Sequence, residues 1–314
     1  MAKHALSSMR EELTLEIKEY STPYGEEGVV SARRIARHTA LTSLAALYKL
    51  TGRMSFLKRN RIQFIYLHHI FEDEEAAFRQ ALRFLSRSHS LISYSEAVER
   101  LWRGEIDRPY VCFSFDDGLK NCLRAARILS EFGVSGCFFI CPSIIGETDH
   151  RKLKEFCVRK LTLPATEMLT WDDVETLINN GHEIGSHTMS HPVLSRISQE
   201  RAQHEISQSY ESLTGRLGAI KHFAWPEGRF FHFNPAAARA VFDAGFQSCA
   251  SAERGCHVTR TEPNPSSLCI RRDYLAARWP LSHSAYFLAS NSQTASAKSN
   301  QWPEGWSERI QKSA

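Results

Sequence analysis

The chain has 314 residues, of which 42% are hydrophobic and 24% are charged, a composition that excludes a disordered or fibrous protein and is typical of a globular enzyme. Its formal net charge is only +4 at pH 7, and no basic stripe with interleaved aromatic residues is present, so we expect no nucleic-acid partner. The densest basic stretch, residues 49–61, indicates a solvated helix face and leaves peripheral contact with a membrane surface as the alternative.

We expect no targeting or membrane-spanning segment from this sequence. Its N-terminal residues are charged and lack the continuous apolar stretch of a signal peptide. The longest apolar stretch, residues 39–50, is too short to cross a bilayer. None of the eight cysteines form a CxxC pair, so we expect buried, reduced thiols. These observations predict a cytoplasmic enzyme.

The hydrophobic pattern predicts three regions along the chain. Residues 1–60 read as a helical extension with a helix at 33–50, residues 61–289 as a β/α domain, and residues 290–314 as a flexible tail rich in Ser, Asn, Gln and Ala. In the β/α domain we predict strands at 63–67, 110–115, 136–141, 183–186, 222–225 and 246–250. We predict helices at 73–86, 119–132, 170–180, 198–217 and 235–244. This alternation implies a parallel sheet or barrel whose active site lies at the C-terminal strand ends.

Two adjacent carboxylates follow the strand at 110–115. Asp116 and Asp117 carry like charges, which is costly beside a buried strand unless a divalent cation binds one of them. The other carboxylate is then available as a general base. The alternative for this Asp-Asp-Gly sequence is a cap on the helix that begins at Leu119.

A histidine pair follows the strand at 183–186. His187 and His191 have HxxxH spacing, which is weak evidence by itself, but a single helical turn at this strand end would place both imidazoles on one side. Hydrolytic metal sites commonly combine histidines with a carboxylate. The sequence therefore predicts a metal site that joins this pair to the Asp-Asp pair.

Three motifs, in this order and at these separations, resemble those of the polysaccharide deacetylase (NodB-homology, carbohydrate esterase family 4) superfamily. They are Phe115-Asp116-Asp117-Gly118, the Gly-His-Glu-Ile-Gly-Ser-His-Thr-Met-Ser-His run at 181–191, and Phe223-Ala224-Trp225-Pro226-Glu227-Gly228. The resemblance covers residues 63–275 and implies a distorted (β/α)7-8 barrel. It also implies metal ligation by Asp117, His187 and His191, with Asp116 as the catalytic base.

The third motif implies an oxyanion site and part of the substrate site. The resemblance assigns the backbone N–H of Glu227, after Pro226, to the oxyanion, a role that is indifferent to the side chain. The family usually has an aromatic residue where Glu227 stands. Pro226 and Trp225 are expected beside the substrate, with Trp225 stacking on a sugar ring or, alternatively, packing in the core.

The general acid is assigned through a permuted branch of the same family. The C-terminal Leu-x-His of ordinary members is missing from residues 267–272. The permuted branch has a histidine in an early strand, and residues 65–70 resemble it with His68 in register; His69 is the alternative and a candidate substrate contact. An arginine near the last strand, Arg271 or Arg272, is expected to orient Asp116, because Ala224 replaces the ordinary motif-three arginine.

The resemblance implies hydrolysis of an N-acetyl or other N-acyl group on an amino sugar, saccharide or sugar conjugate. Zinc is the expected ion, and Fe²⁺, Co²⁺ or Ni²⁺ would fit the same ligands. The alternatives are an amidohydrolase acting on a small non-polymeric substrate and a non-catalytic carbohydrate-binding protein. The absence of GxSxG, Walker A and GxGxxG sequences disfavours serine hydrolases, NTPases and dinucleotide enzymes.

Overall fold

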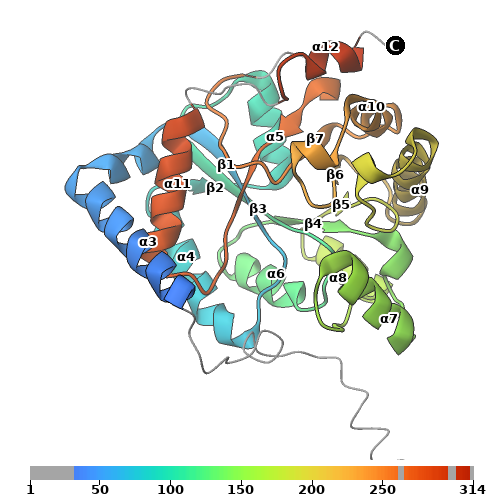
Figure 1. The fold of residues 1–314 in the computed structure, drawn as a ribbon, viewed down its shortest axis with the longest axis horizontal. Coiled ribbons are helices and arrows are strands. Elements are labelled where there is room, and N and C mark those ends of the chain that lie inside the picture. Colours follow the sequence, from blue (N-terminus) through green and yellow to red (C-terminus); the bar gives the residue numbers. More distant parts are fainter. Residues whose placement is uncertain (1–31, 261–264, 296–301, 312–314) are drawn as a thin grey trace, which may run out of the picture.

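A nine-stranded parallel sheet forms the centre of the protein. The computed structural model describes residues 32–260, 265–295 and 302–311 (Figure 1). The strands follow the order β8-β7-β6-β5-β4-β3-β1-β9, and β2 pairs separately with β3. Their bounds are β1 Arg61–Leu67, β2 Ser90–Leu91, β3 Pro109–Phe115, β4 Gly136–Ile140, β5 Glu183–Ser186, β6 His222–Ala224, β7 Ser248–Ala250, β8 Cys269–Ile270 and β9 Arg272–Tyr274.

One short chain segment brings the two edges of this sheet together. β8 pairs with β7, whereas β9 pairs with β1 at the opposite edge, yet only Arg271 separates β8 from β9. The segment therefore bridges the two edges and nearly closes the sheet. The predicted distorted (β/α) barrel is confirmed.

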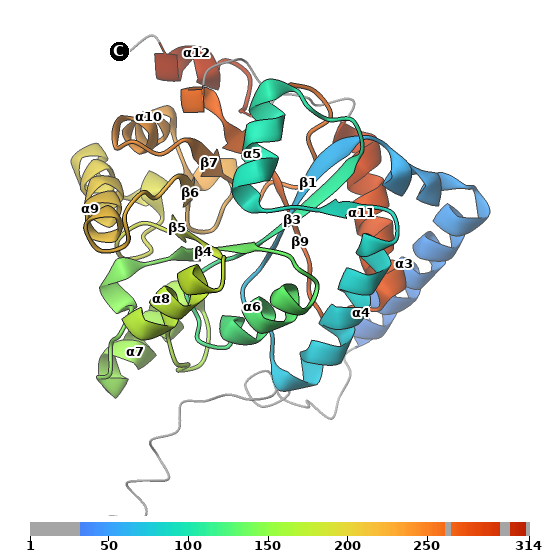
Figure 2. The ribbon, with the colours of Figure 1, turned by 180° about the vertical axis from the view of Figure 1, so that it is seen from behind.

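Helices surround the barrel in both views (Figures 1 and 2). They are α4 Glu75–Ser86, α5 Tyr94–Arg103, α6 Cys122–Glu131, α8 Trp171–Asn179, α9 Gln199–Leu217, α10 Pro235–Asp243 and α11 Leu281–Ala295. Three further helices lie outside this layer or on its rim: α3 Ala32–Leu50, α7 His150–Phe156 and α12 Trp306–Gln311. Short helical turns are η1 Arg53–Lys58, η2 Glu72–Glu74, η3 Pro142–Ile144, the π-helical η4 Cys157–Leu161, η5 Leu194–Arg196, η6 Phe230–His232 and η7 Pro265–Ser267. None of the helices in the described ranges is long and apolar enough to cross a membrane.

Side-chain alternation along the strands separates the barrel interior from the layer beneath the helices. In β1, Ile62 and Phe64 pack inside the barrel with Phe139, whereas Ile65 and Leu67 pack beneath the helices. Asp116 follows β3 at an even spacing from the inward-facing Cys112, so alternation directs it inward as well. Arg272 in β9 has the same relation to the inward-facing Ile270 in β8. The period of two therefore aims two charged side chains into the upper part of the barrel.

The predicted strands and helices of the β/α region agree with the structure to within a few residues. The Thr170–Asp173 capping box at the start of α8 is present as the pattern predicts. All eight cysteines are buried free thiols. Helices α5, α7 and α11 and the bridging β8–β9 segment were not predicted. The α6 helix begins at Cys122 with Asn121 as its N-cap residue, so the Asp-Asp-Gly sequence does not cap it.

The C-terminal residues differ from the expected flexible tail. Residues 290–295 complete α11, and α12 follows at 306–311. Trp302 is only 3% exposed, because its ring stacks against Phe233 and its Nε1 donates a hydrogen bond to the carbonyl of Ser267. At the other end, the helix predicted at 33–50 is α3, and the rest of the predicted extension before residue 32 lies outside the described residues.

Candidate metal and catalytic centre

A polar cavity of about 270 Å³ opens at the C-terminal ends of the barrel strands. Its lining comes from segments that follow β1, β3, β5, β6 and β7, together with β9 and η4. The lining residues are Tyr66, His68, Asp116, Asp117, Lys160, Leu161, Thr162, His187, His191, Trp225, Glu227, Gly228, Ala252 and Arg272. The parallel arrangement thus gathers at one place residues that are far apart in the sequence.

Asp117, His187 and His191 form a buried cluster suited to a metal ion. Oδ1 of Asp117 lies 3.5 Å from Nε2 of His187 and 3.3 Å from Nε2 of His191, and the three ligand atoms lie within 4.8 Å of one another. Atoms bound to one tetrahedral zinc ion at about 2.0–2.1 Å are about 3.3–3.4 Å apart. The donor set and its spacing therefore fit a divalent cation.

The orientation of His187 leaves one ring nitrogen for such an ion. Its Nδ1 lies 2.7 Å from the carbonyl oxygen of Ala224, which can only accept a hydrogen bond. In the neutral ring the hydrogen is therefore on Nδ1 and the lone pair on Nε2, which faces Asp117. A carbonyl that fixes the tautomer in this way is a usual companion of metal-bound histidine.

The segment from His187 to His191 bends without forming a helical turn, so the predicted helical turn is wrong. Thr188 and His191 have φ values of 66° and 58°, in the left-handed region. Glu205 of α9 holds the bend, because its carboxylate accepts hydrogen bonds from the backbone N–H and the hydroxyl of Ser190. Side-chain support from a distant helix leaves no signal in the local sequence.

Charges within the cluster shift its pKa values. Burial disfavours the ionised form of Asp117, but hydrogen bonds from His187 and His191 hold its pKa well below the usual range. Burial likewise opposes protonation of His187, but Asp117 and Asp116 raise its pKa. The carboxylates thus favour a proton on His187, and metal binding at this site would compete with that proton.

Asp116 has a separate partner in Arg272. Nη1 and Nη2 of Arg272 donate hydrogen bonds of 2.7 and 2.8 Å to the two oxygens of Asp116, and both side chains are buried. Nε of Arg272 donates to the carbonyl of Ser251, which fixes the guanidinium plane. Burial alone would lower the pKa of Arg272, but Asp116 raises it. Each Asp116 oxygen retains a further lone pair with which it can accept a proton.

Arg271, the other arginine considered for this role, points elsewhere. Its guanidinium lies 5.3 Å from the centre of the Phe230 ring. The structure thus places Arg272, rather than Arg271, beside Asp116. Strand alternation gives the physical reason, because neighbouring residues face opposite sides.

The two early histidines separate in a similar way. His68 lines the cavity, half-buried beside the rings of Tyr66 and Tyr274. His69 does not line it and packs against Phe71 at 4.5 Å, so the structure does not support its expected contact with substrate. Burial is the larger cause, and the neighbouring His68 the smaller one, of a pKa of His69 that is lowered to about 4.

The Pro226–Gly228 segment forms one wall of the cavity. Glu227 is exposed, lines the cavity and has a φ of 64°. Pro226 is buried and is not among the lining residues. The carbonyl of Gly228 accepts a hydrogen bond of 2.7 Å from the N–H of Ala252, which holds the segment against the strand end of β7.

Trp225 cannot serve as the expected sugar-stacking platform in this structure. It borders the cavity, but its side chain is fully buried, with Phe233 stacked on it at 4.3 Å. Its Nε1 donates to the carbonyl of Arg229 and so supports the Pro226–Gly228 segment from behind. Trp225 therefore packs in the core, which was the alternative to sugar stacking.

Strained backbone is concentrated at the cavity. The described non-glycine residues with positive φ are Asp117, Thr162, Thr188, His191 and Glu227. Four of them line the cavity, and Thr188 lies between the two histidines. Such conformations cost about 1–3 kcal/mol each and persist at sites where the surrounding structure requires them. This clustering points to the cavity as the functional site independently of any sequence motif.

Several residues of the site were missed by sequence reasoning. Ser114 and Ser251 contact Arg272, Glu205 supports the histidine bend, and Lys160 and Thr162 reach the rim from η4. A signal was present only for Ser114, which alternation along β3 places on the same side as Asp116.

Comparisons with known proteins agree with this architecture. Residues 103–248 match the family model for polysaccharide deacetylase. IcaB from Ammonifex degensii is 18% identical, with a TM-score of 0.60 over 75% of this chain and 98% of IcaB. The deacetylase PplD from Streptococcus pyogenes, solved with acetate, is 17% identical, with a TM-score of 0.58 over 73% of this chain and 98% of PplD.

A third solved structure, the polysaccharide deacetylase BC0361 from Bacillus cereus, is 16% identical, with a TM-score of 0.56 over 74% of this chain and 69% of that protein. At these identities the structural matches show a common fold, and the match to the family model covers residues 103–248. Residues 103–248 are therefore similar to a polysaccharide deacetylase domain, and the chain shares the barrel fold of these deacetylases.

Proposed function

We propose that this protein is a metal-dependent deacetylase that hydrolyses an N-acetyl or similar N-acyl group on an amino sugar of a saccharide or sugar conjugate. The observation that carries the proposal is the buried Asp116–Arg272 pair beside the Asp117, His187 and His191 cluster in one cavity. A base held apart from the metal ligands is what such hydrolysis requires.

Asp117, His187 and His191 would hold the ion, and their carboxylate and imidazole donors suit zinc, with Fe²⁺, Co²⁺ and Ni²⁺ as alternatives. When bound, such an ion polarises an acyl carbonyl and lowers the pKa of water. The remaining chemistry falls to the side chains and backbone of the cavity.

In the proposed reaction, Asp116 accepts a proton from water as the water oxygen forms a bond to the acyl carbon. Arg272 keeps the Asp116 carboxylate oriented during this transfer. The backbone N–H of Glu227 stabilises the oxyanion. His68 then protonates the nitrogen as the carbon–nitrogen bond breaks, which releases acetate and a free amine.

The Asp116–Arg272 pair also disfavours a non-catalytic carbohydrate-binding protein. A protein that only retained a metal ion would need Asp117 and not a second buried carboxylate with its own bidentate arginine. A cavity of about 270 Å³ is small, since ligand pockets usually span about 300–1,000 Å³. This size supports a single acylated sugar residue at the reacting centre.

The decisive experiment combines metal analysis with acetate release from chito-oligomers and sugar nucleotides. For Asp116→Asn we expect kcat to fall by at least about 100-fold, because a general base contributes about 10²–10⁴-fold. Metal content should stay unchanged, since Asp117, His187 and His191 are intact. The exposed Asp172→Asn is the matched control and should behave like wild type. Metal-loaded protein that releases no acetate from any of these substrates would refute the proposal.

A further inference from the structure

Helix α3 has an apolar face that no described part of the protein covers. Ile35 is 55% exposed, Leu44 37%, Leu47 49% and Leu50 86%. In Figures 1 and 2 this helix lies at the outer edge of the molecule, with α11 between it and the barrel. Four exposed leucine or isoleucine side chains on one helix are unusual for a surface that contacts only water.

The opposite face of α3 already has its packing partner. Ala45 and Tyr48 are buried, and Tyr48 packs edge-on against Tyr286 of α11 at 4.8 Å. Two positions along a helix correspond to a rotation of about 200°. Leu47 and Leu50 therefore point away from α11 and form a second, apolar face, whereas Leu44, four positions from Tyr48, borders the packed face.

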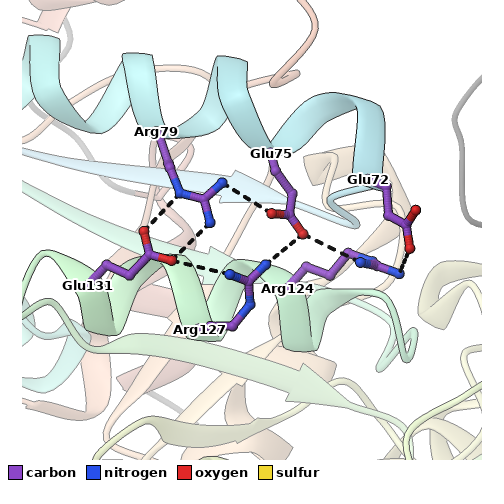
Figure 3. Close-up of polar contacts among 6 residues, drawn as sticks. All are labelled: Glu72, Glu75, Arg79, Arg124, Arg127 and Glu131. Carbon is purple, nitrogen blue, oxygen red and sulfur yellow. Dashed lines mark hydrogen bonds and ion pairs between the residues drawn. The ribbon is translucent and has the colours of Figure 1, made fainter.

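The same part of the chain is strongly basic. Residues 32–71 contain eight Lys or Arg and no Asp or Glu. Five of these basic side chains are exposed on α3, η1 and the turns beside them: Arg37, Lys49, Arg53, Lys58 and Arg59. None of the five forms an ion pair with another described residue, whereas Arg79, Arg124 and Arg127 between α4 and α6 are paired with glutamates (Figure 3).

This combination determines the chemistry of the partner. Leucines exposed on α3, and basic side chains without an ion-pair partner on α3 and η1, fit a surface that is apolar below and anionic above, as at the headgroup boundary of an anionic bilayer. A second copy of the chain fits less well, because a two-fold contact would bring identical basic side chains together without any acidic residue to oppose them. We propose that α3 and η1 dock the protein on an anionic phospholipid surface.

The test is co-sedimentation of the full chain with vesicles. We expect binding to vesicles of phosphatidylcholine with phosphatidylglycerol, weaker binding to phosphatidylcholine alone, and release by salt, because screening weakens exposed charge interactions. Replacing Leu47→Glu with Leu50→Glu, or Arg53→Glu with Lys58→Glu, should weaken binding to the mixed vesicles at least about tenfold.

Ile178→Glu on α8 is the matched control, because Ile178 is 37% exposed, as Leu44 is, but lies on a different helix. It should bind vesicles like wild type, and none of these variants should change acetate release from a soluble substrate. Unaltered vesicle binding by both double variants, or no binding by wild type, would overturn the proposal. A dimer in light scattering that is abolished by the leucine variant would also overturn it and assign the face to a second copy.

Discussion

At the scale of single residues, the neighbours Asp116 and Asp117 meet different partners. Asp116 continues the inward alternation of β3 and meets Arg272, whereas Asp117 adopts a φ of 78° and turns toward His187 and His191. The strained backbone at Asp117 allows two like charges in sequence to occupy separate polar environments. That separation gives one carboxylate to the proposed metal and the other to the proposed base.

Removing Arg272 should destabilise the fold through the carboxylate left behind. For Arg272→Met we expect the free energy of unfolding to fall by about 3–5 kcal/mol, because Asp116 becomes a buried charge without its partner. Adding Asp116→Asn should recover part of this loss. Urea unfolding of the single and double variants measures both effects, and a double variant that shows the sum of the two single losses would contradict this coupling.

The two early histidines offer a matched pair of variants. His68→Gln should lower kcat by about 100-fold, the lower range for a lost acid, because His68 faces the cavity. Its metal content should stay unchanged, because His68 is not one of the proposed ligands. His69→Gln should leave kcat nearly unchanged, because His69 packs on Phe71 instead. Steady-state kinetics with metal analysis distinguishes them, and a larger loss of kcat for His69→Gln would reverse the assignment.

At the scale of elements, a network of ion pairs joins α4 to α6 (Figure 3). Glu75 accepts hydrogen bonds from Arg79 and Arg127 at 3.1 and 2.7 Å, and Arg79 binds Glu131 through two nitrogens. The Glu75 side chain is only 16% exposed, so the network is better shielded than an isolated surface pair. It fastens two neighbouring helices of the outer layer beside each other.

Glu75→Gln should therefore lower the free energy of unfolding by about 1 kcal/mol, the upper range for surface pairs. Burial raises the pKa of Glu75, but hydrogen bonds from its arginine partners outweigh burial and hold this pKa below its ordinary value of 4.5. The stabilisation is thus present above about pH 4.5 and is lost as the pH falls through the folded-state pKa.

Denaturant unfolding at several pH values and salt concentrations measures this difference. High salt should shrink it, because the network is partly exposed. Glu155→Gln is the control, since Glu155 pairs with Arg159 across an exposed i,i+4 step and should contribute less than about 0.5 kcal/mol. If both variants lost the same free energy of unfolding, the network would be no more stabilising than an isolated surface ion pair.

At the scale of the whole molecule, distant parts of the chain complete the barrel and support the site. The β8–β9 segment joins β7 to β1, and β9 supplies Arg272 to the cavity. Trp302 then stacks parallel to Trp225, with ring centres 6.2 Å apart. The C-terminal residues therefore support a wall of the cavity from outside.

Trp302→Ala should lower the free energy of unfolding by about 3–5 kcal/mol, the usual cost of removing a large buried aromatic side chain. Trp306→Ala should cost less, because Trp306 is only partly buried. Thermal unfolding of both variants measures this difference. A Trp302→Ala protein as stable as wild type would show that this segment does not pack on the barrel in solution.

The sequence predicted the local elements well because their signals are local. The sequence predicts the strand Glu183–Ser186, and Thr170 and Asp173 predict the α8 cap. The local sequence predicts a helical turn at His187–His191, but Glu205, 15 residues away from Ser190, holds a bend there. The local composition predicts a flexible tail around Trp302, because its partners, Phe233 and Ser267, are distant in sequence.

The sequence by itself determined the alternation of strands and helices and, through three motifs, the candidate ligands and base. Only the tertiary structure decided between Arg271 and Arg272, and between a cavity position for His68 and for His69. Each choice depends on the direction of a side chain relative to residues far away in the chain. Alternation gives neighbouring residues opposite directions, but only the closed barrel determines which direction leads into the cavity.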